Sequence, residues 1–429
     1  MSINILSLPT EILQDICSRL CQHCNSFAEK DSRVGLANLL HTTHALREAA
    51  LPIRFHEVSI QRDADTYQQL CILYARPDIA LAVKSLKFLA CRYKRLDVLK
   101  MANLLGHQVI TEAGITLPEL NNNEDGTSLG CWLDSFLIDL FLIRTANIER
   151  VELRLTWDAY VGEHLPDDFL LPHLKKISAA AAQIHGGFSI HILDGFFSRA
   201  PNLEVLDLKY CSEVSEEVVL LNVKEINMAY SSIDESGLES IPRLCPNLET
   251  FKYESGGILV GNGVSDFTCA SVRETLLPLE KTLRNLKIDL AESADDDEFQ
   301  NYNPLGSLRS YTTLETLIVS YDSVWDEPDD HSEAARDDSI FVDLLPQSIQ
   351  KFELWGRASE GHHLNIFNST LRLAEAASEG QFPDLITFVY GYFSEEQQAT
   401  VEAALEIAGI KFVRNDSESK IKLYYDGDE

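Results

Sequence analysis

A short apolar motif recurs along much of the chain and is most complete near its middle. Leu203, Leu206, Leu208 and Cys211 have the spacing L-x-x-L-x-L-x-x-C. The alternating residues Leu206 and Leu208 predict a short strand with one buried face. The apolar residues of segment 233–244 then follow a helical period, which predicts a helix. The pattern therefore predicts a unit made of one strand and one helix.

The same apolar spacing, at the first, fourth and sixth positions of a unit, recurs before and after this segment. From residue 148 onward the units begin 20 to 36 residues apart, so several exceed the roughly 20–29 residues of typical repeats of this kind. Such units must stack, because one strand and one helix cannot bury their apolar edge alone. The predicted fold is α/β, a curved solenoid with a parallel sheet over residues 148–414. An irregular α/β fold with several similar strands is the alternative. Besides Leu203, the units begin at Val83, Ile148, Leu174, Val223, Leu248, Leu283, Leu314, Ile349 and Leu385.

Residues 1–56 follow a different pattern, which predicts a module of three short helices. Pro9 suits the first turn of the first helix, and two more apolar helical patterns cover residues 34–40 and 43–52. About 50 residues bury only a small core, so such a module leaves apolar surface for a partner. The apolar residues expected on one side of the first helix are Leu8, Ile12, Leu13, Ile16 and Leu20.

The remaining segments complete the predicted organisation. Residues 57–147 predict linker helices and a first irregular repeat, including a helix that ends before Pro77 and a strongly apolar helix at 132–143. Residues 415–429 predict a loose acidic tail.

The net charge of −31 changes the range of possible partners, because it repels the phosphate backbone of nucleic acids. Two acidic segments, 291–300 and 326–338, follow predicted strands and are expected to loop out. They would either clamp a basic target or remain solvated loops. No apolar run of 18 residues predicts a membrane span, and Met1–Leu6 lack the basic region of a secretory signal. Nine scattered cysteines without disulfide spacing favour an intracellular protein with reduced thiols.

Candidate chemistry is sparse, and we expect neither an enzyme nor a cofactor. The segment Gly261–Gly263 lacks the third glycine of a phosphate-binding loop, and no G-x-S-x-G elbow occurs. Two cysteine and two histidine ligands suggest zinc, but the histidine pair is separated by two residues instead of three to five. The sequence therefore predicts a loop cysteine pair and surface histidines, with no metal. The four residues concerned are Cys21, Cys24, His41 and His44.

Two stretches resemble known families. The patterns L-P-x-E-I-L-x-x-I-x-x-x-L at 8–20 and L-x-x-L-x-x-T-x-x-x-L-R at 36–47 resemble an F-box. Segment 203–253 resembles the cysteine-containing class of leucine-rich repeats, and the combination resembles fungal F-box proteins with a repeat domain. An F-box packs on the adaptor subunit of a cullin-RING ubiquitin ligase, and this implies adaptor contacts by Leu8, Pro9, Ile12, Leu13, Ile16 and Leu20.

The resemblance implies a non-catalytic substrate-recognition subunit of an SCF-type ligase that binds an unknown protein target through its repeats. The alternative is a repeat scaffold whose N-terminal module docks elsewhere or caps the solenoid. In the repeat strands, positions that alternate with the buried ones would form the concave face. We expect them to take an acidic or phosphorylated segment, or else to balance nearby acids without binding anything. The target-facing residues are Arg150, Arg154, Lys176, Asp207, Lys209, Lys252, Lys287 and Trp355, the last as an exposed tryptophan.

Overall fold

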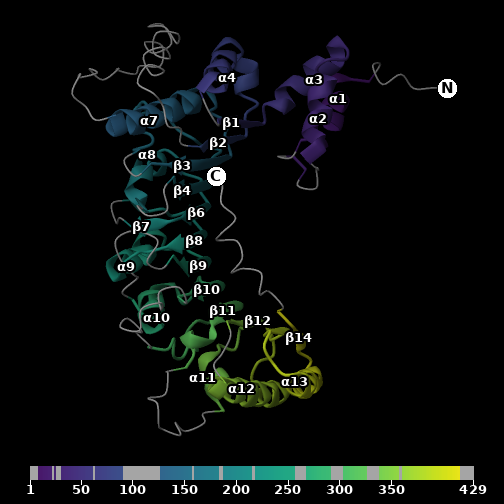
Figure 1. Ribbon diagram of the computed structural model, residues 1–429, viewed down its shortest axis with the longest axis vertical. Coiled ribbons are helices and arrows are strands. Elements are labelled where there is room, and N and C mark those ends of the chain that lie inside the picture. The colour runs from purple at the N-terminus through teal and green to yellow at the C-terminus, as the bar shows by residue number, and fades with distance from the viewer. Residues whose placement is uncertain are drawn as a thin grey trace, which may run out of the picture. The chain divides into compact units, whose positions relative to one another are not determined.

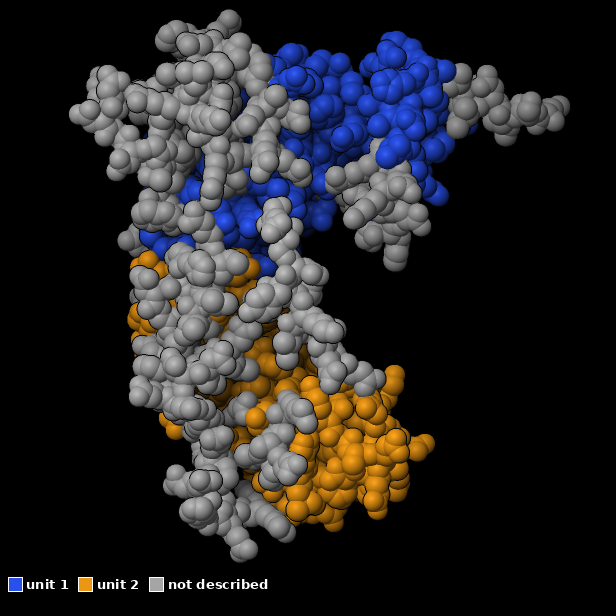
Figure 2. All heavy atoms as spheres, viewed as in Figure 1, with its two compact units in different colours: residues 1–209 blue, residues 210–429 orange. Residues whose placement is uncertain are grey.

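The computed structural model shows an α/β protein with a twelve-stranded parallel sheet, whose strand order is β1-β2-β3-β4-β6-β8-β9-β10-β11-β12-β13-β14 (Figure 1). The chain divides into two compact units, residues 1–209 and 210–429, each described in turn (Figure 2). The residues that the structure describes are 8–21, 24–25, 30–60, 63–89, 126–156, 159–182, 187–214, 218–256, 267–290, 303–325, 338–356 and 360–415. Both acidic segments and the acidic tail lie largely or wholly outside them.

The first unit opens with the three helices that the sequence predicts, α1 (Thr10–Ser18), α2 (Lys30–Leu39) and α3 (His44–Arg54). The Thr43 hydroxyl caps α3 by accepting a hydrogen bond from the backbone N–H of Leu46. A small internal core joins the three helices. It consists of Leu13, Cys17, Cys21, Leu36, Ala49, Ala50 and Ile53.

Five strands of the first unit pair in parallel: β1 (Glu57–Ile60), β2 (Ser85–Leu89), β3 (Arg150–Leu155), β4 (Lys176–Ala181) and β6 (Val205–Lys209). They alternate strictly between buried and outward residues, as the apolar spacing predicts. The apolar motif did not predict strand β1, because its four residues are too few to contain the complete motif. The remaining elements are α4 (Asp63–Ala75), α5 (Pro77–Ala80), α7 (Gly126–Arg144), β5 (Phe188–Ser189), a 3-10 turn (Ile190–Leu193) and α8 (Asp194–Phe197).

A buried carboxylate organises a turn in this unit. Asp139 on α7 accepts hydrogen bonds from the backbone N–H groups of Gly162 and His164, both at 2.9 Å, and lies 3.2 Å from the His164 ring nitrogen. Burial raises the pKa of the Asp139 carboxyl, while the contacts with His164 and the backbone oppose that rise. Gly162 has a φ of 90°, and an added Cβ would lie 2.7 Å from the Cα of Gly195. This position therefore requires glycine.

The second unit continues the pattern with seven strands of the main sheet, which pair in parallel in chain order. The strands are β8 (Glu225–Ser231), β9 (Thr250–Ser255), β10 (Asn285–Asp289), β11 (Thr316–Ser320), β12 (Lys351–Trp355), β13 (Thr387–Val389) and β14 (Lys411–Val413). The other elements are β7 (Cys211–Glu213), α9 (Glu235–Leu244), α10 (Cys269–Thr275), α11 (Ile340–Leu344), α12 (Glu360–Ser378), α13 (Glu395–Ile407) and 3-10 turns at Leu277–Leu279 and Tyr321–Ser323. The predicted helix at 233–244 is confirmed as α9.

The polar position of the motif closes the turn after the strand. The backbone N–H of Cys211 donates to the Ser231 hydroxyl at 3.1 Å. Cys211 and Ser231 are the ninth residues of the repeats that begin at Leu203 and Val223. The preceding residues, Tyr210 and Tyr230, have φ values of 64° and 49°, which are uncommon outside glycine. Their rings stack with centroids 6.0 Å apart. Two consecutive units thus share the same unusual backbone at the same position.

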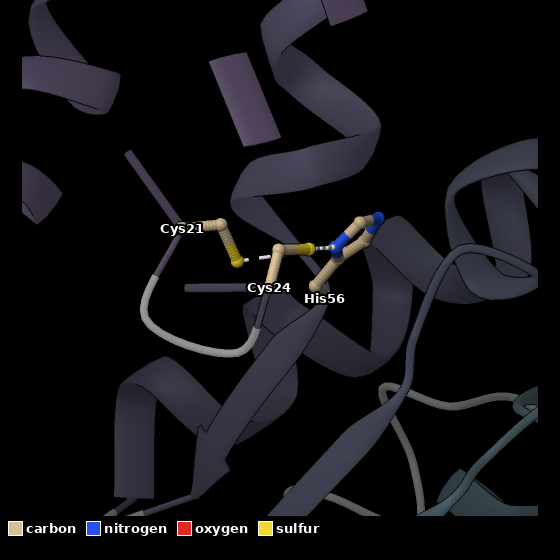
Figure 3. Close-up of side chains that lie close together, drawn as sticks. All are labelled: Cys21, Cys24 and His56. Atoms are coloured by element: carbon tan, nitrogen blue, oxygen red, sulfur yellow. Dashed lines mark hydrogen bonds between the residues drawn. The ribbon is translucent and has the colours of Figure 1, made fainter. Parts of the chain in front are cut away.

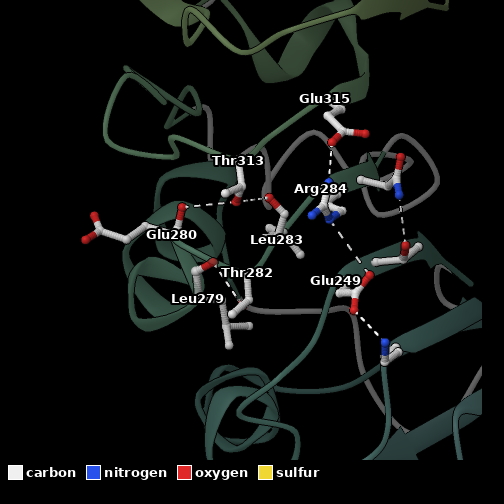
Figure 4. A network of polar contacts seen from close by, with 11 residues as sticks. Glu249, Leu279, Glu280, Thr282, Leu283, Arg284, Thr313 and Glu315 are labelled. Carbon is white, nitrogen blue, oxygen red and sulfur yellow. Dashed lines mark hydrogen bonds and ion pairs between the residues drawn. The ribbon is translucent and has the colours of Figure 1, made fainter.

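The second residue of each repeat takes part in a ladder of backbone hydrogen bonds that aligns neighbouring strands. The backbone N–H of Arg284 donates to the carbonyl of Glu249 at 2.7 Å, and that of Glu315 to the carbonyl of Arg284 at 2.8 Å. The side chains alternate in charge along the same line, so Arg284 forms ion pairs with both glutamates (Figure 4). The first unit repeats this arrangement with Lys84 and Glu149, whose charged groups lie 2.9 Å apart.

The strand phase predicts different costs for two neighbouring substitutions in β6. Leu206 is fully buried, so Leu206→Ala should lower the free energy of unfolding by about 2–5 kcal/mol. Asp207 is half-buried and pairs with Lys176, so Asp207→Ala should cost less than about 1 kcal/mol. Urea unfolding of the full chain measures both. Equal costs would contradict the strand phase.

Candidate functional site

The first helix of the N-terminal module divides the predicted adaptor-binding residues between its core and its surface. Leu13 is 2% exposed and packs with Cys17 inside the module. Leu8 and Leu20 are partly buried against the same core. These three side chains therefore hold the helices together, and the free chain presents little of Leu13 to a partner.

The surface side of the same helix mixes polar residues with an exposed apolar side chain, Ile12. Ile12 is 47% exposed, Pro9 is exposed, and Ile16 is half-buried one turn further along. Val34 on α2 is 59% exposed. These exposed apolar side chains, on a module with so small a core, are the candidates for contact with a partner.

The outward face of the first-unit strands carries most of the residues predicted for target binding. Lys176 forms an ion pair with Asp207 at 3.2 Å. Arg150 and Arg154 are exposed on β3 and form no ion pair with any residue that the structure describes. Lys209 is exposed at the end of β6. The two arginines are thus the cations on β3 that remain available to an anionic ligand.

The second unit places its predicted residues in charge pairs. Lys252 pairs with Glu225 at 2.9 Å and Lys287 with Glu254 at 3.3 Å. Trp355, expected to be exposed, is half-buried, and its indole Nε1 is buried without a hydrogen-bond partner among the described residues. A ring of this size lies against its neighbours even from an outward strand position, so strand phase alone does not determine its exposure.

A cluster of metal-ligating side chains lies where the module meets the first strand. Cys21 and Cys24 come from the loop after α1, and His56 comes from the junction between α3 and β1 (Figure 3). The His56 Nδ1 lies 3.1 Å from the Cys24 Sγ and 3.9 Å from the Cys21 Sγ. Desolvation of the Cys24 thiol and the neighbouring Cys21 sulfur raise the pKa of Cys24 to about 11.

This cluster differs from the ligand set considered from the sequence. His41 and His44 are exposed and do not belong to it, so the two histidines at suggestive spacing are not the ones brought to the cysteines. His56 lies 32 residues after Cys24 and carries no motif of its own. The one sequence feature that marks His56 is its position directly before β1, and the apolar motif did not predict that strand.

Comparison of the chain with protein-family models and with curated proteins finds no match. Among the described residues, no helix combines the length and the apolar character needed to cross a membrane. A functional assignment therefore depends on the side chains and surfaces described above.

Adjacent residues on α1 provide a test of this division between core and surface. Leu13→Ala should destabilise the module by about 2–5 kcal/mol because it opens a cavity in the core. Ile12→Ala removes an exposed side chain and should change stability by about 0.5 kcal/mol or less. Hydrogen exchange of the α1 and α3 amides in the full chain reports both effects. A larger effect from Ile12→Ala would reverse the assigned faces.

Proposed function

We propose that this protein is a substrate-recognition subunit of an SCF-type cullin-RING ubiquitin ligase. Its N-terminal helices act as an F-box that binds the adaptor subunit, and its strand-and-helix units act as leucine-rich repeats that hold a protein target. The protein performs no chemistry itself. It raises the effective concentration of its target near the transferred ubiquitin.

The observation that carries this proposal is the exposure of the apolar residues Pro9 and Ile12 at the start of α1, in a module that follows the L-P-x-E-I-L pattern. An apolar surface of this kind is stabilised when a partner covers it. The parallel strands that follow support the repeat assignment, because they recur at the predicted positions with one face buried. We further propose an intracellular location, because the nine cysteines of the sequence lack disulfide spacing.

The target surface that we favour is the outward side of β3, around Arg150 and Arg154. Arginine binds carboxylates and phosphates in bidentate geometry, so two available arginines on one strand suit an acidic or phosphorylated segment. The pairing of Lys176 with Asp207 supports assigning that lysine to the balance of charge within the sheet instead.

A second function remains a candidate, that of a repeat scaffold outside any ligase. Leu13, Cys17 and Leu36 form a core within the module, which favours a helical cap that is complete without an adaptor. The two functions differ in one measurable property, the affinity for the adaptor.

Adaptor binding is tested with surface variants of α1 in the full chain. The double variant Pro9→Ala and Ile12→Asp should weaken binding to the purified adaptor by at least about 2 kcal/mol, roughly thirtyfold, if these residues anchor the interface. Leu81→Asp is the matched control, because Leu81 is 52% exposed in the same unit but outside the module. Calorimetry gives the affinities. Equal binding by both variants, or no binding by the wild type, would favour the scaffold.

Target binding is tested by charge reversal on β3. Arg150→Glu combined with Arg154→Glu should remove an acidic target from material co-purified with the full chain, and the loss should be greatest at low salt. The control combines Lys281→Glu with Lys411→Glu, because both lysines are exposed, lie outside β3 and form no ion pair with any described residue. Quantitative mass spectrometry at two salt concentrations compares the three proteins. Identical captured proteins and salt dependence would place the target elsewhere.

A further inference from the structure

Three soft or borderline metal ligands converge near the N-terminal module. The Cys21 Sγ, the Cys24 Sγ and the His56 Nδ1 all lie within 4.8 Å of one another (Figure 3). Thiolate sulfur and imidazole nitrogen bind Zn²⁺ at about 2.3 and 2.0–2.1 Å. Two sulfurs and one nitrogen in a tetrahedron with such bonds lie about 3.5–3.8 Å apart by geometry, so the observed separations need only small side-chain movements.

Hydrogen bonds restrain the described backbone next to the two cysteines. The N–H of Cys21 donates to the carbonyl of Ser18 at 3.0 Å, and the N–H of Asn25 donates to the carbonyl of Cys21 at 2.9 Å. The Asn25 side chain also donates to the carbonyl of Arg19 at 3.1 Å. These bonds restrict the backbone beside both cysteines, which lowers the ordering cost of binding an ion.

Backbone hydrogen bonds also hold His56 in place. Its carbonyl accepts hydrogen bonds from the N–H groups of Lys84 and Ser85, at 2.9 and 2.8 Å, where β1 pairs with β2. The N–H of His56 donates to the carbonyl of Ile53 at 3.1 Å. The imidazole therefore projects from a backbone that belongs to the sheet, whereas the sulfurs project from the helical module.

We propose that Cys21, Cys24 and His56 bind a divalent metal ion of the zinc class, with the fourth tetrahedral position open to water. Cys24 is exposed, so solvent reaches the site. Two thiolates with one imidazole favour Zn²⁺ over Mg²⁺ or Ca²⁺, which take oxygen ligands. Binding replaces the thiol protons, and the two protons are released to solvent.

The site joins two segments that are distant in the sequence. The bound ion connects the loop after α1 with the first residue before β1, across 32 residues of sequence between Cys24 and His56. A link of this kind restricts the unfolded chain and supports a module whose own core is small. The expected effect of the ion is therefore to hold these two segments together, and the open fourth position distinguishes the site from a closed zinc site with four protein ligands.

The first experiment measures metal in the wild-type full chain. Protein produced with added zinc and desalted under reducing conditions should contain about one zinc ion per chain by elemental analysis. Replacement by Co²⁺ should produce a thiolate-to-cobalt charge-transfer band and the strong visible absorption of a tetrahedral site. Wild-type protein without stoichiometric metal would overturn the proposal, as would a Cys21–Cys24 disulfide found in this preparation.

Variants then assign the ligands. Cys24→Ser and His56→Asn should each weaken zinc binding by more than about tenfold, because even outer partners of metal ligands contribute 10–100-fold. The matched controls are Cys71→Ser and the pair His41→Asn with His44→Asn, which should bind zinc as the wild type does. Zinc binding that survives loss of both cysteines, or that disappears in the histidine control, would overturn the assignment.

Thiol labelling keeps the test independent of whether a ligand variant folds. In the wild-type chain, zinc should protect the exposed Cys24 from alkylation, and removal of zinc by a chelator should restore its labelling, as mass spectrometry of the labelled peptides shows. Cys71 should react at the same rate in both states. Equal labelling of Cys24 with and without zinc would contradict the site.

Discussion

The rest of the structure depends on the backbone hydrogen bond that aligns each strand with the strand before it. Within each unit of the protein, the backbone N–H at the second position of a repeat donates to the carbonyl at the second position of the preceding repeat. Glu149 to Lys84 is one such bond in the first unit, and Arg284 to Glu249 is one in the second. A shift by one residue would turn every buried side chain outward. This bond therefore keeps the apolar positions of successive repeats in one layer.

Charge alternation along the same ladder reinforces that register. Lysine or arginine at the second position of one repeat faces glutamate in the next, as in the pair of Lys224 with Glu249 and that of Arg284 with Glu315. Each exposed pair contributes little by itself, at most about 1 kcal/mol. Like charges would meet in an incorrect stacking of repeats, so the alternation adds specificity to an alignment that the backbone already makes.

The same need for balanced charge shapes the outward face of the sheet. Lys176, Lys252 and Lys287 are held by neighbouring carboxylates, and this leaves Arg150 and Arg154 as the cations on β3 without an ion pair among the described residues. The N-terminal module depends on different physics. Its core is small. The proposed metal site in the loop after α1 would stabilise the module, whereas burial of apolar side chains alone stabilises the repeats.

The sequence by itself determined the elements that depend on local periodicity. Alternation of Leu206 with Asp207 specified a strand and its buried face, and the helical period after Ile233 specified α9, because both signals lie within a few residues. Only the tertiary structure decided the contacts between distant segments. It brought His56, instead of His41 or His44, to Cys21 and Cys24. It also left Trp355 half-buried and paired Lys176 with Asp207. The physical reason is that a strand period fixes which side a residue faces, whereas its partners depend on which repeat or loop stacks beside it.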